Sequence, residues 1–215
     1  MLSAIDGDAA IVADAEDAPP CDLLSIIGET RRAITFLGEQ RWPVRRLVAF
    51  KLLKVEACPE AVIARALHPA LTHPAVAPLL EGGYIGGRPY LMTPFLGGGP
   101  LRIRYARPAI TMSQRIQALL ALTDVLVIAH GRGLAHGRLT ASNVLCETGA
   151  LPAVRILDFD CNARKIEGDD STEDLVRDDV EGLLTLADAL GLPGLDRLRR
   201  AGVSTLDLRR QFERL

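Results

Sequence analysis

Aromatic residues are scarce in this chain: one tryptophan, three tyrosines and five phenylalanines stand among 215 residues. A hydrophobic core must therefore depend mainly on Leu, Val, Ile and Ala side chains. No stretch approaches the run of about 18 apolar residues that a membrane-spanning helix needs, and the N-terminus has neither the basic flank nor the apolar run of a secretory signal. The sequence thus predicts a cytoplasmic protein without a membrane partner.

Strong charge and paired cysteines are also absent. The formal net charge is −2 and 48% of the residues are apolar, which excludes a disordered chain and predicts no nucleic-acid partner. The four cysteines, at positions 21, 58, 146 and 161, show neither metal-ligand nor redox spacing. We expect them to be reduced thiols, as in a cytosolic protein.

An acidic segment begins the chain. Residues 1–20 contain five acidic residues and no basic residue and end in two prolines, a composition that predicts a flexible arm. The alternative is a short strand or a partner-docking segment over residues 9–13. From residue 22 onward, short apolar runs separated by turn residues predict strands at residues 23–27, 33–37, 46–53, 76–84 and 89–95.

Helical patterns dominate the second half of the chain. Ser113 is the expected N-cap of a long helix that ends near Gly131. The same kind of pattern predicts helices at residues 59–67, 175–190 and 204–215, and two short strands at residues 144–145 and 154–157.

A strand-rich first half followed by a helix-rich second half predicts an α+β fold with two lobes. The boundary is expected near the three glycines at residues 97–99. We therefore predict an acidic arm at residues 1–20, a first lobe at residues 21–97 and a second lobe at residues 98–215.

Two neighbouring loops of the second lobe carry the most specific pattern in the sequence. Residues 136–145 read His-Gly-Arg-Leu-Thr-Ala-Ser-Asn-Val-Leu, and residues 157–160 read Leu-Asp-Phe-Asp. These segments resemble the catalytic loop and the metal-binding loop of protein kinases. The residues Val-Ala-Phe-Lys at 48–51 are similar to the kinase strand that carries the lysine bound to the ATP phosphates.

The resemblance extends in the right order over roughly residues 22–190. The strand around residue 90 resembles the one that leads into the kinase hinge, and it makes Thr93 the analogue of the gatekeeper. Further along, Asp179 matches the aspartate of the central helix, which would brace the backbone around His136. The resemblance implies a bilobal fold with an antiparallel sheet and one short helix in the N-lobe, and a reduced, mainly α-helical C-lobe.

This resemblance also implies a site for ATP and Mg²⁺. Asn143 and Asp158 match the oxygen ligands through which kinases hold Mg²⁺, and Lys51 matches the phosphate-binding lysine. The alternative for each is structural: a solvated lysine on a strand, or polar residues that cap turns. The implied nucleotide-binding residues are Gly28, Thr35, Ala49, Lys51, Thr93 and Leu145.

Arg138 is the decisive departure from the kinase pattern, because it stands where the family carries the aspartate that receives the proton of the substrate hydroxyl. A guanidinium is a permanent cation that only donates hydrogen bonds. Asp160 replaces a glycine of the family, and it is either an additional metal ligand, a displaced base or an inert turn residue. No catalytic residue is therefore assigned.

Other kinase features are missing as well. The phosphate-covering loop keeps Gly28 but has Thr30 and Ala33 where further glycines are expected. The glutamate that pairs with the lysine in kinases would fall near residues 63–64, and the one acid nearby, Glu60, comes about a turn too early. An unpaired Lys51 could swing freely, or it could pair with Asp158 in an inactive arrangement.

Three hypotheses follow. The leading one is a catalytically impaired kinase-like domain, or pseudokinase, that retains ATP and Mg²⁺ binding and regulates a protein partner by docking. The second is a divergent transferase that uses ATP, and the third is an interaction module without a nucleotide. Candidate docking surfaces are the arginine pairs at residues 31–32 and 45–46 and the arginine-rich segment 197–210.

Overall fold

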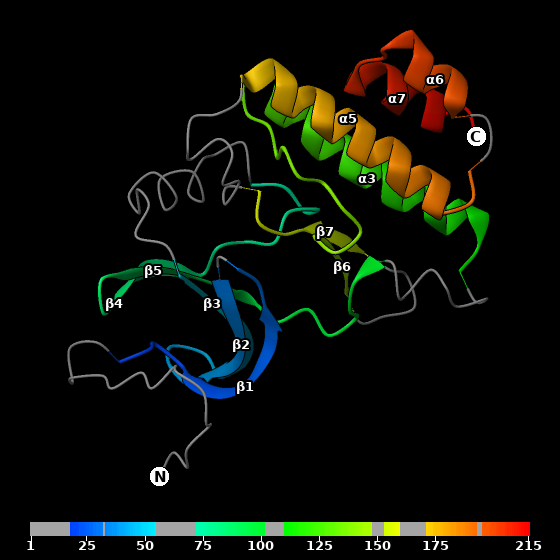
Figure 1. Ribbon diagram of the computed structural model, residues 1–215. Helices are drawn as coiled ribbons and strands as arrows, with labels where there is room; N and C mark the ends of the chain where they lie inside the picture. The colour runs from blue at the N-terminus through cyan, green and yellow to red at the C-terminus, as the bar shows by residue number, and fades with distance from the viewer. Residues whose placement is uncertain are drawn as a thin grey trace.

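A five-stranded antiparallel sheet forms the first lobe of the computed structural model (Figure 1). The structure describes residues 18–31, 33–54, 72–101, 110–147, 153–159, 171–192 and 195–215. The predicted helix at residues 59–67 and the arm up to residue 17 lie outside the described residues. The strands are β1 (Asp22–Glu29), β2 (Ala33–Gln40), β3 (Arg46–Leu53), β4 (Glu81–Ile85) and β5 (Arg88–Pro94), in the spatial order β1-β2-β3-β5-β4.

Successive side chains along each strand point to opposite faces of this sheet. One face holds a buried core in which Phe50 stacks on Tyr90, with a distance of 5.0 Å between the ring centroids, and Phe36 lies 6.4 Å from Phe50. Three of the few aromatic residues of the chain thus pack together in the core of the first lobe. The opposite face carries Thr35 and Lys51, which are direct partners in the β2–β3 register.

Helices build the second lobe, and the small sheet of β6 (Val144–Cys146) and β7 (Val154–Ile156) lies between them and the large sheet (Figure 1). The helix α3 (Met112–His130) packs against α5 (Thr172–Ala189) and α7 (Thr205–Phe212), and α6 (Asp196–Ala201) precedes α7. Leucine dominates this core, as the composition predicts. Its fully buried members include Leu119, Leu122, Leu126, Leu183, Leu208 and Phe212.

Capping hydrogen bonds define where the helices begin. The helix α3 begins after Thr111, whose side chain accepts a hydrogen bond from Gln114 N while the Gln114 side chain accepts one from Thr111 N. The prediction that Ser113 is the cap is therefore wrong. The predicted start of the last helix at residue 204 is confirmed, because Ser204 caps it and forms the same reciprocal pair with Asp207.

The predicted strand over residues 76–84 is mostly wrong. Only Glu81–Ile85 pairs as β4, while Val76 forms an isolated parallel bridge to Ile156 of the second lobe. Pro78 lies between these two pairings, and a proline interrupts a strand because it has no backbone N–H to donate. Residues 75–77 are consequently attached to β7 of the second lobe, whereas Leu80, directly before β4, already hydrogen-bonds to Met92 of the sheet.

The connection between the lobes passes very close to β6. A Cβ atom on Gly98 would lie 2.2 Å from the carbonyl oxygen of Cys146, so no larger residue fits there without a shift of the backbone. The next residue, Gly99, accepts a hydrogen bond of 2.9 Å from Cys146 N. This hydrogen bond holds β6 against the segment that connects the two lobes.

By length and composition, α3 is the one helix among the described residues that could cross a membrane. Its apolar residues nevertheless form much of the core of the second lobe, where Leu119, Leu122 and Leu126 are completely buried against the neighbouring helices. Packing within the lobe buries 39% of this apolar segment.

Candidate functional site

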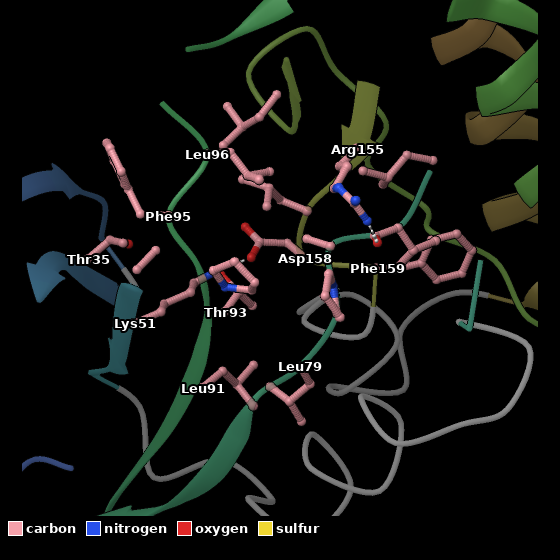
Figure 2. A pocket seen from close by; sticks show the side chains of 18 of the residues that line it. Thr35, Lys51, Leu79, Leu91, Thr93, Phe95, Leu96, Arg155, Asp158 and Phe159 are labelled. Carbon is pink, nitrogen blue, oxygen red and sulfur yellow. Dashed lines mark hydrogen bonds and ion pairs between the residues drawn. The ribbon is translucent and has the colours of Figure 1, made fainter. Parts of the chain in front are cut away.

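A cavity of about 810 Å³ opens between the sheet of the first lobe and the β6–β7 region of the second (Figure 2). Asp158 and Phe159 line its floor, and Ser142 is also part of the lining. Every residue for which the kinase resemblance implies nucleotide contact lines the same cavity: Gly28, Thr35, Ala49, Lys51, Thr93 and Leu145. The structure thus brings together residues from five strands, β1, β2, β3, β5 and β6, although their roles in binding stay predictions.

Lys51 and Asp158 form an ion pair across the cavity, with 2.6 Å between Nζ and Oδ1. Lys51 comes from β3 and Asp158 from the loop after β7, so the pair joins the two lobes (Figure 2). Of the two arrangements predicted for Lys51, the structure shows the pairing with Asp158. Asp158 has a φ of 57°, which is uncommon for a residue other than glycine and marks a conformation that its surroundings must hold in place.

The part of the cavity lined by the large sheet and β6 has room for a flat ligand. Thr35 of β2 and Ala49 of β3, both small, line it from the large sheet, and Leu145 of β6 lines it from the second lobe. Residues 94–96 match the kinase hinge, and there Phe95 N donates to the carbonyl oxygen of Leu47, so this N–H is already used. Leu96, the next residue in the cavity lining, is therefore the better candidate to donate to a base.

The turn between β1 and β2 is short. Ala33 N donates to Thr30 Oγ1 at 3.0 Å, and Thr30 N donates to the carbonyl oxygen of Ala33 at 2.8 Å. The Thr30 side chain and the Ala33 backbone thus close the turn, where a glycine-rich loop would let backbone N–H groups approach a phosphate. Gly28 lines the cavity from the preceding strand.

His136 connects the two loops that resemble the kinase catalytic and metal-binding loops. Arg138 N donates to its Nδ1 at 3.1 Å, so the other ring nitrogen, Nε2, carries the proton and donates to the carbonyl oxygen of Leu157 at 2.9 Å. The ring also makes an edge contact with Phe159 at 5.5 Å. Burial lowers the pKa of His136 below its usual value of 6.5, although Asp179 nearby favours the charged form.

This burial predicts a pH-dependent loss of stability. The unfolded chain protonates His136 at a pKa near 6.5, whereas the folded protein keeps it neutral to lower pH. Between pH 6.5 and pH 5 the unfolded state therefore binds more protons, and the free energy of unfolding falls on acidification by at most about 1.4 kcal/mol per pH unit. Urea unfolding should show a steeper fall for the wild type than for His136→Gln over this range; equal slopes would contradict the assignment.

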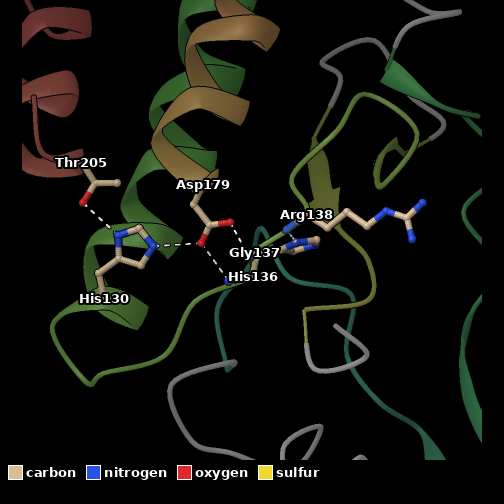
Figure 3. Close-up of polar contacts among 6 residues, drawn as sticks. All are labelled: His130, His136, Gly137, Arg138, Asp179 and Thr205. Atoms are coloured by element: carbon tan, nitrogen blue, oxygen red, sulfur yellow. Dashed lines mark hydrogen bonds and ion pairs between the residues drawn. The ribbon is translucent and has the colours of Figure 1, made fainter. Parts of the chain in front are cut away.

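Asp179 holds the catalytic-loop backbone, as the resemblance predicts. Its carboxylate is completely buried and accepts hydrogen bonds from His136 N at 2.8 Å and from Gly137 N at 2.6 Å (Figure 3). The same carboxylate contacts His130 Nε2 at 2.9 Å, and His130 Nδ1 lies 3.2 Å from Thr205 Oγ1. Neither His130 nor Thr205 is predicted from the sequence.

The predicted metal ligands differ in their placement. Asp158 points into the cavity, whereas Asn143 lies outside its lining and donates through Nδ2 to the carbonyl oxygen of Arg138 at 2.9 Å. Within the described ranges, no group of three or more His, Cys, Asp or Glu side chains could hold a metal by itself. Asp160 and Glu60 lie outside the described residues.

Comparisons with known proteins place this geometry among kinases. No family model matches the chain. The DNA damage-responsive serine/threonine-protein kinase RqkA of Deinococcus radiodurans is 32% identical over 147 residues, which are 64% of this chain and 21% of RqkA. The serine/threonine-protein kinase Pkn1 of Myxococcus xanthus is 35% identical over 74 residues, or 34% of this chain and 10% of Pkn1. The chain thus spans at most about a fifth of these relatives' length.

Solved kinase structures show the same fold at low sequence identity. Rad53 in complex with AMP-PNP has a TM-score of 0.65 and 17% identity, over 80% of this chain and 48% of that one. The kinase domain of Mycobacterium tuberculosis PknI has a TM-score of 0.56 and 16% identity, over 82% of this chain and 78% of that one. The chain therefore has a protein-kinase-like, bilobal α+β fold, and this prediction is confirmed.

Proposed function

We propose that this chain is a pseudokinase: a kinase-like domain that binds ATP but is impaired in phosphoryl transfer and regulates a protein partner. The observation that carries the proposal is Arg138 in the loop that Asp179 and His136 hold in place. A kinase needs a carboxylate there to accept the proton of the substrate hydroxyl. Arginine is a permanent cation that only donates hydrogen bonds, so it cannot accept this proton.

The cavity supports retained nucleotide binding. Its volume and its lining by Lys51, Ala49 and Leu145 favour a bound nucleotide over a closed, nucleotide-free module. Asp158 and the side-chain oxygen of Asn143 are the oxygen donors that would hold Mg²⁺, with phosphate oxygens and water as further ligands. When bound, this ion would neutralise the charge of neighbouring phosphates.

Apolar side chains on the first lobe support docking of a protein partner. Leu24 and Ile26 on the edge strand β1 are exposed, and so are Trp42 and Val44 between β2 and β3. The predicted arginine surfaces fit less well, because Arg45 pairs with Glu39, and Arg199 and Arg209 also bind acidic side chains. We propose that the partner docks on the first lobe. We also propose that the protein is cytoplasmic.

The first test is the melting temperature with ATP and Mg²⁺. A ligand at 100 times its Kd stabilises the native state by about 2.7 kcal/mol, so we expect a rise of several degrees, which EDTA reduces. Lys51→Ala and Asp158→Ala should each abolish most of the rise. Lys54→Ala is the matched control, because Lys54 also ends in an ion pair, with Glu29 at 2.5 Å, but outside the cavity lining.

The alternative of a divergent transferase is favoured by one observation: Lys51 and Asp158 are both retained, and both line the cavity. Positioning and electrostatics supply much of the catalysis in phosphoryl transfer. Transfer of label from radioactive ATP that disappears in Asp158→Ala would establish this alternative. No rise of the melting temperature at millimolar ATP would instead favour the nucleotide-free module.

A further inference from the structure

The side chain of Arg138 has no role in the contacts described above, which involve only its backbone. It is exposed, and within the described part of the chain no carboxylate pairs with it. The neighbouring cations are engaged, since Lys51 binds Asp158 and Arg155 binds Glu147. Among the described residues, Arg138 is thus an exposed cation without a carboxylate partner; it lies outside the cavity lining itself.

The backbone of Arg138 is fixed relative to the cavity. His136 and Asn143 each hydrogen-bond to Arg138, and each also bonds to Leu157: His136 Nε2 to its carbonyl oxygen and the carbonyl oxygen of Asn143 to its N–H at 2.7 Å. The next residue, Asp158, lines the cavity, as does Ser142. In Figure 3 the Arg138 side chain extends away from Asp179 and the helices.

Charge balance gives this arginine a chemical role. Because Asp158 already neutralises Lys51, the polyphosphate of a nucleotide would meet little net positive charge from this pair alone. Guanidinium binds phosphate through two parallel hydrogen bonds and stays charged at any physiological pH. We propose, on the basis of the nucleotide binding proposed above, that Arg138 binds the terminal phosphate of a nucleoside di- or triphosphate.

The substitution that removes the proton acceptor thereby creates a phosphate anchor. Such a site binds the nucleotide without transferring its terminal phosphate. It also distinguishes ATP and ADP from AMP, which lacks the phosphates that reach Arg138. Because arginine supplies part of the positive charge, this preference persists without a divalent cation.

The experiment measures the Kd values of ATP, ADP and AMP by calorimetry in EDTA. We expect the wild type to prefer ATP over AMP, and Arg138→Ala to weaken ATP at least tenfold while the Kd of AMP changes less than twofold. Arg138→Lys should fall between them, because it keeps the charge but loses the paired hydrogen bonds. Arg132→Ala, another exposed arginine in the turn after α3, controls for the lost charge and should leave all three Kd values unchanged.

The other outcomes are distinct. Equal weakening of ATP and AMP in Arg138→Ala would show that the arginine supports the loop, and would overturn the inference. Unchanged ATP binding in this variant would overturn it as well, while the proposed nucleotide site would stand. If the wild type binds none of the three nucleotides, with or without Mg²⁺, both this inference and the proposed ATP binding fail.

Discussion

Replacing Asp179 with alanine is expected to lower the free energy of unfolding by about 3–5 kcal/mol, the usual cost of removing one partner from a buried charged network. Two backbone N–H groups, of His136 and Gly137, would lose their acceptor in a region closed to water. Each such unsatisfied group costs about 1–3 kcal/mol. The contact with His130 would be lost in addition.

Chemical denaturation followed by circular dichroism at the helix band measures this effect. Asp179→Asn tests the geometry, because the amide keeps one acceptor but turns a donor toward a backbone N–H; we expect most of the loss to remain. Asp196→Ala is the matched control, since its side chain is 87% exposed, and it should change stability by less than about 0.5 kcal/mol. A loss below about 1 kcal/mol for Asp179→Ala would contradict the bracing role.

Replacing Phe212 with alanine is the second change with a large expected effect. Phe212 is completely buried where α7 packs on α3, and truncation of a buried phenylalanine to alanine costs about 3–5 kcal/mol. We expect the second lobe to lose stability and α7 to separate from α3 more readily. Because Thr205 at the start of α7 contacts His130, the support of the catalytic-loop backbone should weaken too.

A matched control lies on the same helix. Leu206 is 43% exposed, so Leu206→Ala should cost less than about 1 kcal/mol. Circular dichroism suits the comparison, since every described helix belongs to the second lobe. Similar losses for Phe212→Ala and Leu206→Ala would mean that α7 does not contribute its buried face to the core.

Local sequence patterns determine much of this fold. The alternation of buried and half-buried residues in β2 and β3 is visible in the sequence, and the predicted strand bounds there are close to those observed. The start of α3 was predicted at Ser113, although Thr111 and Gln114 also form a capping-box pattern. Thr111 and Ser113 are both residue types that cap helices. The reciprocal hydrogen bonds between Thr111 and Gln114 determine which of the two is the cap, and residue type alone does not predict them.

The candidate site was predictable only in part. Lys51, Thr35 and Leu145 line one cavity, as the kinase resemblance implies. The distance between Lys51 and Asp158, however, depends on how the two lobes sit on each other. The contact between His130 and Thr205 depends likewise on the packing of α3 against α7, and residues 75 positions apart carry no local signal of this contact.

The ion pair between Lys51 and Asp158 has a consequence for regulation. This ion pair directly joins the two lobes. A phosphate that binds Lys51, or a cation that binds Asp158, must therefore compete with the ion pair and with the lobe contact that it makes. A partner protein that prefers the form in which the pair is broken would be linked to such a ligand. By reciprocity, the ligand would then raise the affinity for the partner by the same factor as the partner raises the affinity for the ligand.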